Sequence, residues 1–145
     1  MIESKKFSLV KPAVDTPFHI DFEWWRQHDS NWKVYLLSLL CPEHRTEFEG
    51  MDNDSSFDFI DPETAEIHTV DGLQHTLINH CAKSPDFITH HTTMVDTVFR
   101  TFMTNGNTPM SPIQLGEQTH RSPETILKTF VGHTIYKGIR PCQKC

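Results

Sequence analysis

The chain has little that would place it in a membrane or in a known enzyme class. No run of about 18 consecutive apolar residues occurs, which excludes a membrane-spanning helix and predicts no membrane association. A glycine-rich phosphate loop, a G-x-S-x-G motif and an H-E-x-x-H motif are all missing, so we expect no enzyme. The first residues lack a secretory signal, which predicts a cytoplasmic protein. In that compartment the four cysteines are expected to be reduced or metal-bound.

Enough apolar residues are present to build a core. The 145 residues, of which 37% are hydrophobic, suffice for one domain or two small ones packed together. The formal net charge of −6 is unevenly distributed. Residues 94–145 hold six basic and three acidic side chains, whereas residues 1–93 hold seven basic and 16 acidic ones. An acidic front part repels phosphate, so only the last third is suited to bind nucleic acid.

The front part begins with an arm and a helical segment. Residues 1–17 carry two prolines and no apolar period, which predicts an extended arm. The tryptophan-rich segment 18–25 precedes apolar residues spaced as one helical face: Trp32, Tyr35, Leu36, Leu39 and Leu40. Pro42 either breaks this helix or begins a short new one. These aromatic residues are expected to form core, with a docking face for a neighbour as the alternative.

A hairpin and a further helix follow. Segments 57–60 and 66–70 alternate in polarity on either side of a turn at 61–64, which predicts two antiparallel strands. Asp71, with Gln74 three residues later, has the spacing of a capping box for a helix. The apolar stripe of that helix would end at Cys81. Residues 18–91 therefore predict a small α+β module of helices and one hairpin.

The last third predicts three helices with clear termini. The first begins after Thr93 and ends at Asn105 and Gly106. Ser111 and Ser122 each precede a proline, the arrangement of an N-cap and first helical position, and Gln114 completes a capping box. The third helix is expected over residues 123–130.

Residues 110–130 resemble a helix-turn-helix. Leu115 and Ile126 match its buried positions, Gly116 matches the small residue at the helix crossing, and Ser122 caps the second helix. His120 stands at the turn position where glycine is usual, and it can adopt the left-handed conformation. Residues 134–140 are strand-like and similar to a wing. Residues 92–141 thus resemble a winged helix-turn-helix domain, followed by a Cys-x-x-Cys tail at 142–145.

The resemblance implies a transcription regulator that binds DNA. In that family the second helix lies in the major groove with its early residues on base edges. The residues that this implies as DNA contacts are Arg121, Ser122, Thr125, Lys128, Lys137 and Arg140. Many winged helices instead dock proteins, and an outward-facing Leu127 fits that use. The alternative is therefore an adaptor or accessory subunit that binds a protein partner, or a second copy, through the winged helix and the tryptophan-rich segment.

Cysteine and histidine pairs indicate a structural zinc site. Cys41-x-x-His44 has a spacing that lets both side chains reach one tetrahedral ion, and His80 and Cys81 offer a second pair. The favoured set is Cys41, His44 and Cys81, with His80 or His75 as the fourth ligand. A rival set joins Cys41 and His44 to Cys142 and Cys145. Alternatively, Cys81 is an ordinary core residue and no metal is bound.

Overall fold

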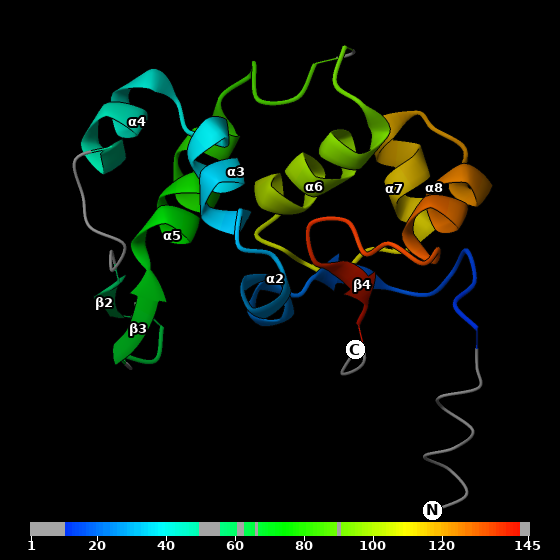
Figure 1. Ribbon diagram of the computed structural model, residues 1–145, viewed down its shortest axis with the longest axis horizontal. Coiled ribbons are helices and arrows are strands. Elements are labelled where there is room, and N and C mark those ends of the chain that lie inside the picture. Colours follow the sequence, from blue (N-terminus) through cyan, green and yellow to red (C-terminus); the bar gives the residue numbers. More distant parts are fainter. Residues whose placement is uncertain (1–10, 50–55, 61–62, 66, 90, 143–145) are drawn as a thin grey trace, which may run out of the picture.

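The structure is a computed structural model that describes residues 11–49, 56–60, 63–65, 67–89 and 91–142. It is an α+β protein, as the sequence predicts. The elements follow in the order β1 (Phe18–Ile20), α2 (Phe22–His28), α3 (Trp32–Leu39), α4 (Pro42–Glu49), β2 (Ser56–Ile60), β3 (Ile67–Asp71), α5 (Gly72–Asn79), the 3₁₀ turn η1 (Cys81–Lys83), α6 (Met94–Thr104), α7 (Pro112–Thr119), α8 (Pro123–Phe130) and β4 (Ile139–Pro141) (Figure 1).

The predicted helix over 32–40 is confirmed. It is α3, and Leu36, Leu39 and Leu40 of its predicted apolar face are buried. The tryptophan-rich segment before it divides into β1 and α2, because the Asp21 carboxylate accepts a hydrogen bond from the backbone N–H of Trp24 and caps α2. Pro42 begins the short helix α4. Most of this segment therefore packs inward.

The predicted hairpin is also confirmed. Strands β2 and β3 pair antiparallel, with Phe57 opposite Val70 and Phe59 opposite His68. Helix α5 begins directly after β3 and buries Leu73 and Leu77. The predicted cap at Asp71 concerns a side chain that lies outside the described part of the chain.

Three helices form in the last third, as predicted, and α7 and α8 begin at side-chain caps. Helix α6 buries Val98, Phe99, Phe102 and Met103 and ends at Asn105. At the start of α7, the Ser111 hydroxyl accepts from the backbone N–H of Gln114, and the Gln114 side chain accepts from the backbone N–H of Ser111. The Ser122 hydroxyl caps α8 by accepting from the backbone N–H of Thr125. Local hydrogen bonds therefore set these helix starts.

The strand expected over residues 134–140 is wrong for most of its length. Only Ile139–Pro141 is extended, as β4, and it pairs antiparallel with β1 rather than with a neighbouring segment. Lys137 and Gly138 have φ values of 54° and 74°, and a left-handed backbone interrupts an extended strand. Phe18 of β1 also bridges to Met110, which precedes α7. The strand that pairs with β4 is therefore β1, which lies more than 110 residues earlier in the chain.

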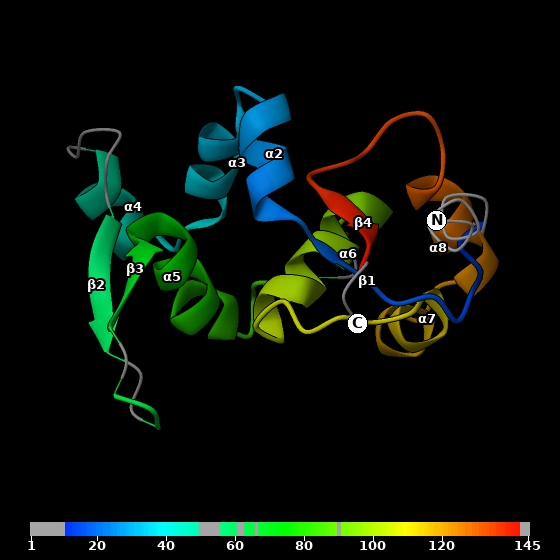
Figure 2. The same ribbon diagram turned by 90° about the horizontal axis from the view of Figure 1, so that it is seen from below.

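One core joins the front module (residues 18–91) to the last third. The ring centroid of Trp25 on α2 lies 5.4 Å from that of Phe99 on α6 and 5.9 Å from that of Tyr35 on α3. Buried side chains of both parts belong to a single hydrophobic cluster. Strand β1 lies beside β4 and next to α6, between the hairpin end of the molecule and the α7–α8 end (Figure 2). The front module, which carries the predicted metal ligands, and the last third, which carries the predicted DNA contacts, are therefore attached to the same core.

Candidate metal centre and candidate nucleic-acid interface

Four ligand-type side chains converge between α4 and α5. Each of Cys41, His44, His80 and Cys81 offers one ligand atom, and these atoms all lie within 4.8 Å of one another. The Cys41 Sγ is 3.3 Å from the Cys81 Sγ and 3.0 Å from the His44 Nδ1, which in turn is 3.7 Å from the Cys81 Sγ. This is the favoured set of the sequence analysis, with His80 rather than His75 as its fourth member.

The start of α4 positions the first pair. The Cys41 carbonyl accepts a hydrogen bond from the backbone N–H of Arg45. Cys41 therefore lies directly before the N-terminus of α4, and His44 lies within the first turn of that helix. The Arg45 guanidinium donates to the carbonyls of Ser38 and Leu40 and holds the link between α3 and α4. Proline at position 42 suits the first turn, since its missing N–H needs no partner there.

The end of α5 positions the second pair. The backbone N–H of His80 donates to the Thr76 carbonyl, and Cys81 begins the turn η1. The ring centroids of His44 and His80 are 4.2 Å apart. Cys81 is buried, while Cys41 and His44 are half-buried and His80 is exposed. A depression of about 500 Å³ opens beside Cys41, His80 and Cys81, which leaves an ion a path to the cluster.

The two thiols differ in acidity. The hydrogen bond with His44 lowers the pKa of the Cys41 thiol to about 7. Burial raises the pKa of the Cys81 thiol to about 11. A thiolate is the form that ligates metal, so the cluster holds its first thiolate at Cys41 near neutral pH. A bound cation would stabilise the second thiolate at Cys81.

The spacing fits a tetrahedral ion. Metal–sulfur bonds of about 2.3 Å and metal–nitrogen bonds of about 2.0–2.1 Å place tetrahedral ligand atoms about 3.3–3.8 Å apart. The three distances among Cys41, His44 and Cys81 lie within a few tenths of an ångström of that range. The cluster could therefore hold a metal ion.

The rival ligand set is not formed. Cys142 is disulfide-bonded, whereas Cys41 and Cys81 are free. The expectation that all four cysteines are reduced or metal-bound is thus wrong for Cys142. Its backbone N–H donates to the carbonyl of Pro17, which holds it beside β1.

Helices α7 and α8 meet in a tight turn. His120 lies between them with φ 59° and ψ 41°, the left-handed conformation expected for it. A Cβ at Gly116 would lie 2.6 Å from the Arg121 carbonyl oxygen and 3.0 Å from the Pro123 Cγ. Leu115 and Ile126 are buried, as predicted. Only glycine allows α7 and α8 to approach this closely.

The six candidate DNA contacts divide into two groups. Ser122, Thr125 and Lys128 are exposed along α8. The other three are held by internal contacts. The Arg121 guanidinium donates to the Thr92 carbonyl at 2.9 Å. The Lys137 Nζ lies 4.1 Å from the centroid of the Tyr35 ring.

Arg140 is the third internally held cation. Its guanidinium forms an ion pair with Asp21 at 3.3 Å and lies over the Trp24 ring. The aromatic residues that engage these cations lie about 100 residues earlier in the chain, so no local pattern indicated the pairing. The predicted basic surface of the last third is therefore smaller than its sequence suggests.

The predicted outward position of Leu127 is wrong. Leu127 is half-buried against the core, because α8 turns this side chain toward its neighbours. Exposed apolar side chains lie elsewhere: Val34 on α3, Ile113 on α7, and Val131 and Tyr136 after α8. The sequence analysis missed these four, since a single exposed apolar residue carries no periodicity.

Comparison of the chain with protein-family models, with curated proteins and with solved structures finds no match. No helix in the described part of the chain is both long and apolar enough to cross a membrane. The candidate metal cluster and the α7–α8 unit are therefore the features of this chain that bear on its function.

Proposed function

We propose that this protein is a DNA-binding regulator, whose α7–α8 unit contacts the duplex and whose Cys41–His44–His80–Cys81 cluster holds a structural zinc ion. The observation that carries the first part is the crossing of α7 and α8 at Gly116, with α8 at the surface. This arrangement resembles the helix-turn-helix, in which the second helix enters the major groove.

The exposed start of α8 supplies the contacts. Ser122 is the N-cap of α8 and Thr125 lies in its first turn, where helix-turn-helix proteins read base edges. The Ser122 hydroxyl is already bonded to Glu124 and to the Thr125 N–H, so Thr125 is the better candidate for a base contact, and Lys128 follows one turn later for a phosphate. Glu124 also lies in the first turn, and its carboxylate would repel the phosphates of the duplex. With few basic side chains at the surface of α8, binding is expected to be weak and to fall moderately with added salt.

Fluorescence anisotropy with a labelled random duplex tests this part of the proposal. The full chain should bind at low ionic strength, and Lys128→Glu should abolish binding by placing a second carboxylate on α8. Lys83→Glu, the same charge change at an exposed position in η1, is the matched control and should bind within about twofold of the parent. Absence of binding by the parent chain at low salt would overturn the DNA assignment.

The ligand chemistry supports zinc as the metal. Two thiolates and two imidazoles form the Cys₂His₂ set common in structural zinc sites. Four protein ligands leave no open position for a substrate, which favours a structural role. The ion would tie the start of α4 to the end of α5, in a part of the chain whose hairpin alone has little core.

Metal analysis of protein purified without chelator tests this second part. About one equivalent of zinc is expected, with a lower melting temperature after its removal. Cys81→Ser should lose the metal, whereas His75→Ala, which changes a histidine of α5 outside the cluster, should keep it. Less than about half an equivalent in the parent protein would count against the site.

Protein docking is the second candidate function. Three of the four basic side chains proposed for phosphate contact are engaged within the chain, while Ile113, Val131 and Tyr136 are 38–43% exposed around α7 and α8. A partner that covers these apolar side chains would suit that surface better than DNA does. The tryptophan-rich segment contributes little, since Trp25 is only 1% exposed. Failure of the parent chain to bind duplex would favour this candidate.

A further inference from the structure

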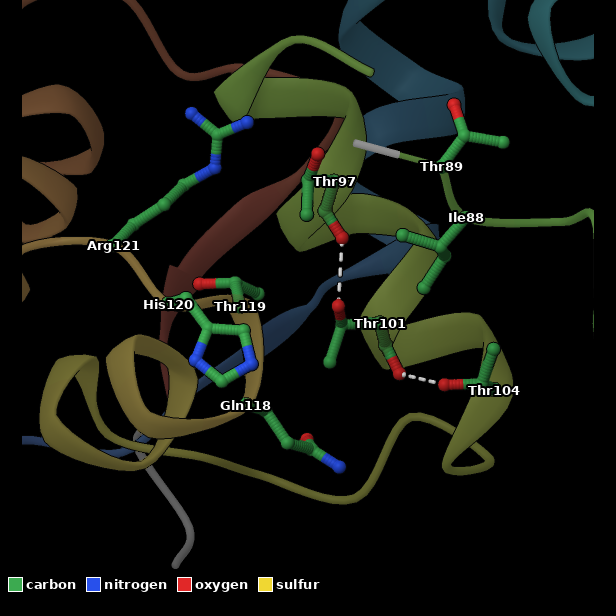
Figure 3. Close-up of a pocket in the computed structure, with 9 residues that line it drawn as sticks. All are labelled: Ile88, Thr89, Thr97, Thr101, Thr104, Gln118, Thr119, His120 and Arg121. Carbon is green, nitrogen blue, oxygen red and sulfur yellow. Dashed lines mark hydrogen bonds between the residues drawn. The ribbon is translucent and has the colours of Figure 1, made fainter. Parts of the chain in front are cut away.

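A cleft lies between α6 and the turn that joins α7 to α8. One wall is the face of α6 that carries Thr97, Thr101 and Thr104, and the opposite wall is the segment 118–121. Ile88 and Thr89 close a third side (Figure 3). The cleft encloses about 540 Å³, within the range of small-molecule sites.

The α6 wall presents hydrogen-bond acceptors. Each threonine hydroxyl donates its only hydrogen to a backbone carbonyl. Thr101 donates to Thr97 at 2.7 Å and Thr104 to Thr101 at 2.7 Å (Figure 3), and Thr97 donates to Thr92 at 3.1 Å. The oxygen of each hydroxyl therefore keeps only lone pairs for a ligand. Thr97 and Thr101 are at most 5% exposed, whereas Thr104 is exposed, so Thr104 offers the accessible oxygen of this wall.

The opposite wall presents donors and positive charge. The Arg121 guanidinium has five N–H groups, and its bond to the Thr92 carbonyl at 2.9 Å holds it in place with one of them. His120 and Gln118 lie beside it on the same wall (Figure 3). None of the described side chains that line the cleft is a carboxylate. An anion entering here thus meets a fixed guanidinium without opposing charge on the walls.

We propose that this cleft binds a sugar phosphate, or a polyhydroxylated organic anion of that size. The anionic group would bind Arg121, because a guanidinium forms strong charge-assisted hydrogen bonds with phosphate. The ligand hydroxyls would donate to the Thr104 oxygen on α6. The inference concerns ligand binding alone and does not depend on whether α8 binds DNA.

The test is a titration of isotope-labelled full-length protein followed by NMR, with ribose 5-phosphate, inorganic phosphate and ribose as separate probes. Saturable shifts of the Thr97, Thr101 and Arg121 signals are expected with ribose 5-phosphate at millimolar concentration or below. Inorganic phosphate should bind more weakly at the same residues, and ribose more weakly still. Shifts with inorganic phosphate equal to those with ribose 5-phosphate would overturn the role of the hydroxyls.

Two variants and one control complete the test. Arg121→Gln should weaken the binding of ribose 5-phosphate by about tenfold or more, since it removes the charge-assisted hydrogen bond. Thr104→Val, which keeps the side-chain shape, should weaken its binding without changing the affinity for inorganic phosphate. Lys83→Gln removes the same charge from an exposed position in η1, outside the cleft, and should leave affinity unchanged. No saturable shift in the parent protein, or equal loss in Arg121→Gln and Lys83→Gln, would overturn the proposal.

Discussion

The Sγ atoms of Cys41 and Cys81 lie 3.3 Å apart although 40 residues separate them in the chain. Cys41 is the last residue between α3 and α4, and Cys81 is the first residue of η1, after α5. The packing of these elements brings the two thiols together. Both are free, and a histidine follows or precedes each within three residues. This relationship defines the candidate metal centre more directly than the cysteine spacing does.

Alkylation of the metal-free protein should distinguish the two thiols. The pKa of Cys41 is about 7 and that of Cys81 is about 11, and the thiolate is the reactive form. We expect iodoacetamide to modify Cys41 first, with a rate that rises as the pH passes through 7, and Cys81 slowly. Peptide mass mapping measures both. Equal rates at pH 7, or faster modification of Cys81, would contradict the arrangement of the pair.

Tyr35→Phe should destabilise the protein by about 1–3 kcal/mol, the cost of leaving a partly buried charged partner without its donor. The Tyr35 hydroxyl donates to Asp96 Oδ1 at 2.5 Å and so links α3 to α6. Chemical denaturation at neutral pH measures the change. Tyr136→Phe, at a position 38% exposed, is the control and should change stability by less than about 0.5 kcal/mol.

The same hydroxyl predicts a loss of stability at high pH. Burial, together with the hydrogen bond and charge of Asp96, raises the pKa of Tyr35 above its ordinary value of 10.0. Its neutral form therefore stabilises the fold fully below pH 10, and this contribution falls as the pH rises further. Unfolding free energies measured from neutral pH to beyond pH 10 should decline more steeply in the parent than in Tyr35→Phe. Parallel curves would refute the assignment.

Gly138→Ala should destabilise the protein by about 2 kcal/mol or more, through a left-handed φ and overpacking. Gly138 has φ +74°, and an added Cβ would lie 2.8 Å from the Trp25 Cβ and 2.9 Å from the Asp21 carbonyl oxygen. Thermal and chemical denaturation measure the effect. Gly106→Ala, at φ +71° with no described atom within 4 Å, should cost only the conformational penalty of about 1–2 kcal/mol.

Gly116→Ala should loosen the crossing of α7 and α8. An added Cβ would lie 2.6 Å from the Arg121 carbonyl oxygen, so the helices must separate, at a cost of about 1–3 kcal/mol. Gly132→Ala, where the nearest described atom is 3.9 Å away, should be close to neutral. Hydrogen exchange of α8 amides adds a local readout. Unchanged protection in Gly116→Ala would argue against the close crossing.

Local signals were sufficient for most helices and for the hairpin. The starts of α7 and α8 depend on Ser111 and Ser122, whose hydroxyls bond to backbone groups three residues later. Such bonds form within one turn, so the residues themselves determine them. The alternation of β2 and β3 around a short turn is equally local.

The fourth member of the candidate metal cluster, and which basic side chains are engaged within the chain, could be known only from the tertiary structure. His75 and His80 are both on or beside α5, and only packing against α4 shows that His80 faces Cys41 and His44. Lys137 and Arg140 look available in the sequence, yet Tyr35 and Trp24 engage them from the other end of the chain.

The sequence by itself determined where most helices begin and which residue types offer metal ligands, because short-range hydrogen bonds and residue chemistry decide these. The fold alone decided that β4 pairs with β1, that Arg121 turns into a cleft and that Leu127 packs inward. These outcomes depend on contacts between segments far apart in the chain, whose free energy no short stretch of residues contains.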